Sequence, residues 1–283
     1  MLQEPTTTAG RAGLAALLAD PARALLALDF DGTLAPIVAD PERAAAHPGA
    51  AAALAALAGR IGTVAVVTGR PALAAVRLGG FADTPGLERL VVLGHYGAER
   101  WDGATGRLTA PQVHPGVAAV RAELPGLLAA LDAPEGTWLE DKDRSLAVHT
   151  RRTAEPDALL ERLRGPLAEL AAAHGLAVEP GRMVVELRPP GVDKGAALTG
   201  LVGERAAGAV LYAGDDLGDL AAFAAVERLR GAGLPGLLVA SGPVTGEPPV
   251  REVAERADLV VPGPAGVVAL LEGLARALEG LRR

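Results

Sequence analysis

The chain has few or none of several residue types. Its 283 residues include no cysteine and no asparagine, and two lysines, Lys142 and Lys194, stand against 25 arginines. Without cysteine there is no disulfide and no thiolate metal site. Aromatic residues make up 2% of the sequence, the net charge is −7, and no run of basic residues occurs. Nucleic acid is bound by aromatic stacking platforms and positive surfaces, so we expect no nucleic-acid partner.

Long apolar runs are also missing. No stretch approaches the roughly 18 apolar residues that span a bilayer. The N-terminus carries Glu4 and no basic cluster ahead of the short apolar stretch 12–19, which is unlike a secretory signal. We therefore expect a cytoplasmic protein with no membrane partner.

The scarcity of lysine reflects a bias that acts along the whole chain. Arginine replaces lysine almost everywhere, and isoleucine occurs twice among many valines and leucines. Lysine is a compact, mobile charge, whereas arginine is a planar fork. We therefore expect Lys142 and Lys194 to occupy positions that arginine cannot fill.

Short apolar runs alternate with alanine- and leucine-rich stretches of helical length. The runs are near-continuous hydrophobic blocks, as in strands covered on both faces. This alternation predicts an α/β fold with a Rossmann-like parallel sheet. The expected strands are 24–28, 63–67, 89–93, 209–213, 236–240 and 258–261, and the expected helices are 48–60, 71–78, 194–202, 217–230 and 266–281.

A middle segment follows a different pattern. Polar and apolar residues mix across 138–151, as in strands with one wet face, and 156–173 has the pattern of an amphipathic helix. The stretch 176–187 predicts a hairpin that turns at Pro180-Gly181. We expect an α+β domain at 108–187, inserted into an α/β core formed by 1–107 and 188–283.

Acidic residues stand at the end of the first expected strand, in Asp29-Phe30-Asp31-Gly32-Thr33. Open parallel sheets bind ligands at the carboxyl ends of their strands. Mg2+ takes oxygen ligands from a few carboxylates together with a phosphate. The motif therefore indicates a metal and phosphate site, and an acidic turn is the alternative for this motif taken alone.

Polar motifs of the same kind occur later in the chain. Thr68-Gly69-Arg70 offers a hydroxyl and backbone N–H groups to a phosphate oxygen, or Thr68 caps the next helix. Lys194 stands at a helix start, where its charge suits a phosphate. Three carboxylates within 214–219 repel one another unless a cation lies among them. The alternative explanation of these carboxylates is a helix N-terminus, where the helix dipole favours acidic residues.

The order of these motifs resembles the haloacid dehalogenase superfamily of phosphatases, and the insert resembles that superfamily's type C2 α/β cap. More narrowly, the chain resembles the trehalose-6-phosphate phosphatases over almost its whole length. In the last motif it departs from them, because Gly218 and Leu220 replace the usual threonine and glutamate on either side of Asp219. The narrower resemblance depends on the motifs at 29–37, 94–99, 140–142, 149–151 and 186–189.

The resemblance implies Mg2+-dependent hydrolysis of trehalose 6-phosphate in trehalose biosynthesis, and functional coupling to a trehalose-6-phosphate synthase. Asp29 would attack the phosphorus, Asp31 would act as acid and then as base, and Thr68 and Lys194 would stabilise the phosphoryl oxygens. The implied metal ligands are Asp29, Asp31, Asp215, Asp216 and Asp219. The implied substrate contacts are Asp29, Phe30, Asp31, Gly69, Arg70, His95, Glu140, Lys142, His149, Arg151 and Glu186.

Three alternatives stay open. The chain could be another capped sugar phosphatase, acting for example on sucrose phosphate or mannosylglycerate phosphate. It could be a phospho-accepting signalling domain, whose pocket also combines acids, a threonine and a lysine. It could also be a sugar-phosphate sensor without turnover. Asp31 argues against the signalling domain because it supplies the acid and base step of turnover.

Overall fold

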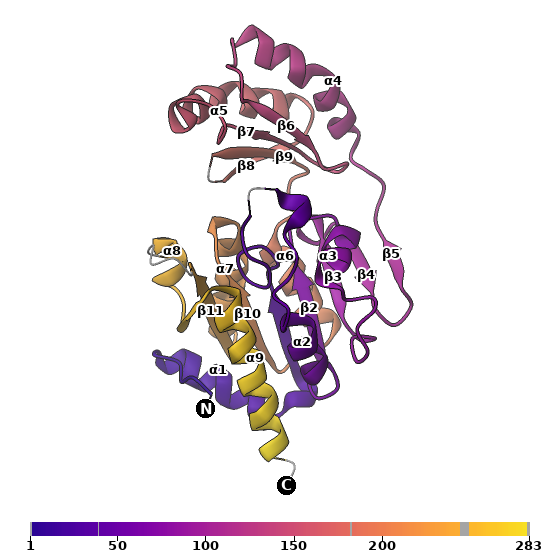
Figure 1. Cartoon of the computed structure of the whole chain (residues 1–283), viewed down its shortest axis with the longest axis vertical. Coiled ribbons are helices and arrows are strands. Elements are labelled where there is room, and N and C mark those ends of the chain that lie inside the picture. Colours follow the sequence, from indigo (N-terminus) through magenta and orange to yellow (C-terminus); the bar gives the residue numbers. More distant parts are fainter. Residues whose placement is uncertain (1, 39, 182, 244–248, 282–283) are drawn as a thin grey trace. The chain divides into compact units, whose positions relative to one another are not determined.

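The computed structural model describes residues 2–38, 40–181, 183–243 and 249–281. The chain divides into two compact units, a larger one of Met1–Ala110 with Asp193–Arg283 and a smaller one of Pro111–Val192 (Figure 1). These divisions fall a few residues after the boundaries expected at 107 and 187. On the N-terminal side the reason is a strand, β5 (Arg107–Thr109), which pairs with β4 (Glu99–Asp102) in the sheet of the larger unit.

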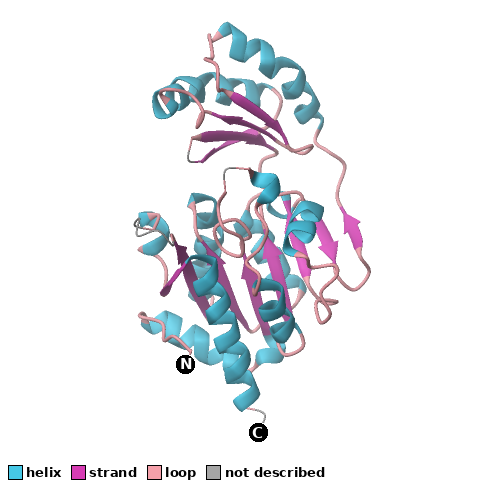
Figure 2. Cartoon of the chain, in the orientation of Figure 1, coloured by secondary structure: helices cyan, strands magenta, loops and turns pink. Residues whose placement is uncertain are grey.

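The larger unit contains a sheet with helices on both faces (Figure 2). Among the described residues its strand order is β12-β11-β10-β1-β2-β3-β4-β5. The strands from β12 to β3 are parallel, and β4 and β5 are antiparallel to their neighbours. Consequently the carboxyl ends of β1, β2 and β10 lie at the same edge. The parallel strands are β1 (Ala24–Leu28), β2 (Thr63–Val67), β3 (Val91–Gly94), β10 (Ala209–Gly214), β11 (Gly236–Gly242) and β12 (Leu259–Pro262).

Both faces of this sheet are covered by apolar helix residues. One face packs against α1 (Thr8–Ala19), α2 (Ala50–Ala58), α3 (Ala72–Gly79) and α9 (Gly263–Gly280). The opposite face packs against α6 (Lys194–Glu204), α7 (Leu220–Gly231) and the short α8 (Arg251–Ala254). All five residues of β1 are therefore buried, and a buried leucine contributes roughly 1.5–3 kcal/mol. No helix within the described ranges is both long and apolar enough to cross a membrane.

The smaller unit has an antiparallel sheet with one apolar face. Its strand order is β6-β7-β9-β8, and its helices α4 (Pro115–Ala130) and α5 (Pro156–Ala173) pack against one side of the sheet. The expected turn at Pro180-Gly181 is wrong, because both residues belong to the end of β8 and pair with β9. The strands are β6 (Trp138–Asp141), β7 (Leu146–His149), β8 (Ala177–Gly181) and β9 (Val184–Arg188).

Candidate active site

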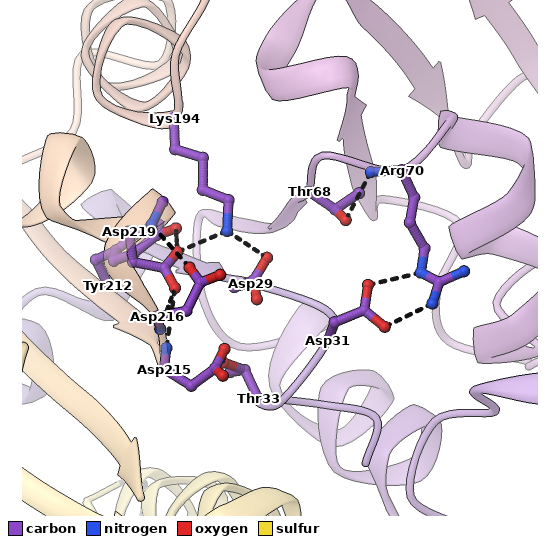
Figure 3. A network of polar contacts seen from close by, with 11 residues as sticks. Asp29, Asp31, Thr33, Thr68, Arg70, Lys194, Tyr212, Asp215, Asp216 and Asp219 are labelled. Carbon is purple, nitrogen blue, oxygen red and sulfur yellow. Dashed lines mark hydrogen bonds and ion pairs between the residues drawn. The ribbon is translucent and has the colours of Figure 1, made fainter. Parts of the chain in front are cut away.

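A buried lysine joins two carboxylates at the carboxyl edge of the larger sheet (Figure 3). Asp29 directly follows β1, where its backbone N–H bonds to β10, and Lys194 is the first residue of α6. Lys194 Nζ donates to Asp29 Oδ1 at 2.6 Å and to Asp219 Oδ1 at 2.7 Å. No side chain of the three is more than 5% exposed. The ammonium is thus held at one point, in contact with the expected nucleophile.

Asp219 accepts hydrogen bonds on both carboxylate oxygens. Its Oδ1 also accepts the hydroxyl of Tyr212 at 2.6 Å. Its Oδ2 accepts the backbone N–H groups of Asp215 at 2.9 Å and of Asp216 at 3.2 Å. Asp219 therefore links Lys194 to the turn that follows β10.

The acidic residues fit a divalent cation. Asp29, Asp215 and Asp219 each offer one oxygen, and these atoms lie within 4.8 Å of one another. Gly32 leaves room for this cluster, because a Cβ at Gly32 would lie 2.0 Å from Asp215 Oδ2. Its φ of +74° is also one that glycine adopts without strain. Hard carboxylate oxygens are the donors that Mg2+ prefers.

The other two predicted metal ligands, Asp216 and Asp31, are not part of this cluster. One oxygen of Asp216 accepts the backbone N–H of Gly218 at 2.9 Å. Both oxygens of Asp31 accept hydrogen bonds from Arg70. The role of all five residues as metal ligands stays a prediction. For Asp31 the predicted ligand is the backbone carbonyl.

Burial sets the charge balance of this site. Loss of solvent raises the pKa of Asp29 well above its ordinary value, against the opposing charge of Lys194. Burial also raises the pKa of Asp215, and the negative charge of the neighbouring Asp29 raises it further. For Lys194, burial alone would lower the pKa, but Asp219 and Asp29 outweigh it and raise the pKa well above the ordinary value. The site therefore has too little positive charge for its carboxylates, and a bound cation would supply it.

We expect Mg2+ to stabilise the protein more at high pH than at low pH. Without metal, the raised pKa values of Asp29 and Asp215 mean that the folded state binds their protons more tightly than the unfolded state. The free energy of unfolding then falls as pH rises from about 4 through those raised values. Mg2+ needs the deprotonated carboxylates, so the Mg2+-induced rise in Tm should be larger at about pH 8 than at about pH 5. Equal rises at the two pH values would contradict the assignment.

Asp31 and Arg70 form a bidentate ion pair beside the carboxylate cluster. Arg70 Nε and Nη2 each donate to a different Asp31 oxygen at 2.6 Å. Arg70 is anchored in turn by Nη1, which donates to the carbonyl of Pro41 at 2.9 Å, and its guanidinium lies 5.8 Å from the ring centre of Phe30. A bidentate pair fixes the direction of a carboxylate as well as its position. Arg70 therefore orients the expected acid and base.

The loop after β2 is held by two residues with strained backbones. His95 and Tyr96 have φ values of 47° and 58°, a region that costs non-glycine residues roughly 1 kcal/mol or more each. Their backbone N–H groups donate to the carbonyls of Arg70 at 2.8 Å and Thr68 at 2.9 Å. The Tyr96 ring also lies against Gly69, where a Cβ would meet it at 2.7 Å. The strained turn thus fixes the loop that carries the Thr68 hydroxyl.

The smaller unit has a polar network on the sheet face opposite its core. Lys142 Nζ donates to Glu186 Oε2 at 2.9 Å and lies 3.9 Å from Glu140 Oε2. Ser145 Oγ donates to Glu186 Oε1 at 2.6 Å. His149 Nε2 lies 2.9 Å from Glu140 Oε2. The structure therefore brings together four of the predicted sugar contacts.

The aromatic ring beside this network fixes the orientation of His149. The imidazole stacks on Trp138 with ring centres 4.6 Å apart, and the Arg152 guanidinium lies 5.1 Å from the centre of the Trp138 ring. Arg151, another predicted contact, is exposed in the turn after β7. In the larger unit the Phe30 side chain is fully buried against Phe81, so only its backbone is left for a substrate contact.

Three hydroxyl residues that contact a site residue or its loop were not predicted from the sequence. Tyr212 binds Asp219, Ser145 binds Glu186, and Ser241 Oγ donates to the carbonyl of Gly32 at 2.7 Å. The signal that could have found them is their scarcity. The chain has two tyrosines and two serines, and both serines support a site residue or its loop.

The comparisons with known proteins agree with this fold. A solved haloacid dehalogenase-like hydrolase from Bacteroides thetaiotaomicron matches 91% of the chain and 98% of its own length, with a TM-score of 0.60 at 15% identity. The C-terminal domain of Candida albicans trehalose-6-phosphate phosphatase matches 97% of the chain and 99% of its own length, with a TM-score of 0.71 at 21% identity. The fold is therefore haloacid dehalogenase-like, with a Rossmann-like core and an α+β insert, as expected.

Sequence comparison gives the narrower assignment. The trehalose-phosphatase family model matches residues 27–252. The chain belongs to the trehalose-phosphatase family. A probable trehalose-phosphate phosphatase of Sinorhizobium fredii is 34% identical over 238 residues, covering 82% of the chain and 84% of that protein. An uncharacterised glycosyl hydrolase of Mycobacterium tuberculosis is 40% identical over 224 residues, covering 73% of the chain but only 15% of that protein's length.

Proposed function

We propose that this chain is a Mg2+-dependent phosphatase that hydrolyses trehalose 6-phosphate to trehalose and phosphate. Family membership supports the substrate class. The observation that carries the proposal is the arrangement at the end of β1. The buried Asp29 contacts Lys194. Asp31 follows two residues later and is oriented by Arg70. This arrangement provides a nucleophile and a separate acid and base for one phosphoryl group.

In the first step Asp29 attacks phosphorus. Its Oδ1 accepts the bond from Lys194, which leaves Oδ2 as the attacking atom. A bond forms between Oδ2 and phosphorus as the bond from phosphorus to the sugar oxygen breaks. Asp31 gives its proton to that oxygen, so trehalose leaves as a neutral alcohol and Asp29 carries the phosphoryl group.

In the second step water hydrolyses the aspartyl-phosphate. Asp31, now ionised, takes a proton from the water as the water oxygen attacks phosphorus, and phosphate leaves Asp29. A protonated carboxyl oxygen is a weaker acceptor than a carboxylate oxygen, so the two bonds from Arg70 are strongest while Asp31 is ionised. Arg70 therefore holds Asp31 most firmly in the state that accepts a proton.

Lys194, Thr68 and the carboxylate cluster provide the electrostatic part of catalysis. Lys194 and the Thr68 hydroxyl stabilise charge on the phosphoryl oxygens that do not leave, since phosphoryl transfer depends mainly on positioning and charge. Asp29 and Asp215 would hold Mg2+, which when bound offsets the repulsion between the carboxylates and the phosphate. The chain would act in the cytoplasm, coupled to a trehalose-6-phosphate synthase that supplies its substrate.

The polar network of the smaller unit would bind sugar hydroxyls. A carboxylate accepts hydrogen bonds from hydroxyls and an ammonium donates to them, so Glu140, Lys142 and Glu186 together suit a polyol. Their mutual contacts hold each side chain in place before the sugar arrives. His149 and Arg151 would extend the same surface.

We expect Lys142→Ala to impair the hydrolysis of trehalose 6-phosphate more than that of a small aryl phosphate. Loss of a charged donor to a sugar hydroxyl should raise KM for trehalose 6-phosphate about tenfold or more. A small aryl phosphate has no sugar to bind, so its turnover should change less than about twofold. Steady-state kinetics on both substrates test this difference.

A matched control lies in the same unit. Arg164 on α5 forms an exposed pair with Glu161, with no contact to the network, and such pairs contribute about 0–1 kcal/mol. Arg164→Ala should leave the turnover of both substrates unchanged. If Lys142→Ala impaired the two substrates equally, Lys142 would have no role in sugar binding.

The experiment that tests the proposed function is phosphate release from a panel of substrates. The panel contains trehalose 6-phosphate, sucrose 6-phosphate, mannosylglycerate phosphate, glucose 6-phosphate and an aryl phosphate, each with Mg2+ and with a chelator. The proposal predicts many turnovers per molecule, preference for trehalose 6-phosphate, and loss of activity in chelator. A preference for another sugar phosphate, or a single turnover, would contradict it.

A further inference from the structure

The hydroxyl of Tyr212 has a partner that packing alone does not require. Tyr212 lies in β10, is fully buried, and packs edge-on against Phe223 with ring centres 6.1 Å apart. A phenylalanine would fill the same apolar space without a polar atom to satisfy. The chain has only two tyrosines. A buried hydroxyl in this place therefore indicates a function of the oxygen.

That hydroxyl completes the hydrogen bonds of Asp219. A carboxylate has about four acceptor sites. Three of those on Asp219 accept Lys194 and the backbone N–H groups of Asp215 and Asp216, and Tyr212 supplies the fourth donor. These donors come from α6, β10 and the turn after β10, so they hold the Asp219 side chain in place and leave Asp29 and Asp215 as the carboxylates of the cluster for a cation.

The orientation of Asp219 decides where the Lys194 ammonium lies. Lys194 is shared between Asp219 Oδ1 at 2.7 Å and Asp29 Oδ1 at 2.6 Å. Tyr212 donates to the same Asp219 oxygen, so it competes with Lys194 for that oxygen's electron density and fixes its direction. Without the hydroxyl, Asp219 would bind the ammonium more strongly and turn toward it, and the contact with Asp29 would weaken.

We propose that Tyr212 is a positioning residue for Lys194, acting through Asp219. The inference rests on the proposed phosphatase function, in which Lys194 stabilises the phosphoryl oxygens. A residue with only a packing role would affect stability when changed, whereas a positioning residue affects kcat.

The test compares Tyr212→Phe with Phe223→Leu. Tyr212→Phe keeps the ring and removes the hydroxyl, and we expect kcat to fall about tenfold on both trehalose 6-phosphate and an aryl phosphate, with KM within about twofold, as for loss of one hydrogen bond to a charged group. Phe223→Leu removes ring packing and keeps the hydroxyl. It should lower Tm and leave kcat within about twofold.

The two lysines of the chain allow a second readout that is independent of activity. In protein labelled with 15N on lysine, the ammonium signals of Lys194 and Lys142 can be assigned by Lys142→Arg. Tyr212→Phe should shift the Lys194 signal and leave the Lys142 signal unchanged, and Phe223→Leu should move neither. The positioning role is overturned if Tyr212→Phe leaves the Lys194 signal and kcat unchanged. If the wild-type protein releases no phosphate, the proposed function fails, while the NMR comparison still tests whether Tyr212 positions Lys194.

Discussion

Asp29→Asn should reduce phosphate release from trehalose 6-phosphate by roughly four orders of magnitude or more. The amide oxygen is a poor nucleophile and carries no charge, so the covalent step is lost. An effect on binding alone would raise KM and leave kcat intact. Phosphate release at saturating substrate, measured with Mg2+, therefore tests the role of Asp29 as nucleophile.

Stability provides the control for Asp29→Asn. Burial raises the pKa of Asp29, so the charged form destabilises the metal-free folded state at pH values above the unfolded pKa. The uncharged amide removes this cost, and Lys194 keeps its ion pair with Asp219. The variant without metal should therefore unfold at a Tm no lower than wild type at pH 7. An inactive variant with a strongly lowered Tm would show misfolding and not loss of the nucleophile. A folded variant with normal turnover would exclude Asp29 as nucleophile.

Lys194→Ala is expected to impair both stability and catalysis. Removal of the ammonium leaves Asp29 and Asp219 buried without their cation, and breaking a buried ion pair costs about 3–5 kcal/mol. Loss of the ammonium charge that stabilises the phosphoryl oxygens should also lower kcat about a thousandfold. Urea unfolding at pH 7 and steady-state kinetics measure the two effects.

An ion pair on the surface provides the control for Lys194→Ala, because it shows the effect of removing a positive charge that is not buried. Arg256 pairs with Glu227 on the exterior, where both side chains are about a third exposed or more. Arg256→Ala should therefore cost about 0–1 kcal/mol and leave kcat unchanged. If Lys194→Ala were no more destabilising than Arg256→Ala, the buried network would not depend on Lys194.

The sheet of the larger unit was predictable because its strands are apolar along their whole length. A strand buried on both faces has no alternation of polar and apolar residues, so a continuous apolar run such as 209–213 stands out from the neighbouring sequence. The strand predicted at 209–213 is confirmed by β10. Helix α5 was predicted with its bounds, since its leucines recur at helical spacing. Helices α1 and α4 were not predicted, because alanine and glycine on several faces weaken their periodicity. All three residues of the short edge strand β5 are exposed, so the strand lacks the apolar signal of a buried one.

The candidate site was predictable where a polar residue directly follows a buried strand. Asp29, Thr68 and Asp215 all have that position, and scarcity of lysine pointed to Lys194. Pairings between distant residues were not predictable. Arg70 contacts Asp31 across 39 positions of sequence, a contact created only when β1 and β2 pair.

The most direct test of the account is to trap the enzyme during turnover of trehalose 6-phosphate labelled in its phosphate. The account predicts an acid-stable, base-labile phosphoenzyme that forms and decays at rates compatible with kcat. Borohydride reduces an aspartyl-phosphate to homoserine and releases the labelled phosphate, so peptide mass analysis after reduction should find Asp29 converted to homoserine. The Asp29→Asn variant should carry neither the label nor homoserine. Turnover with no phosphoenzyme, or a label on any other residue, would contradict the account.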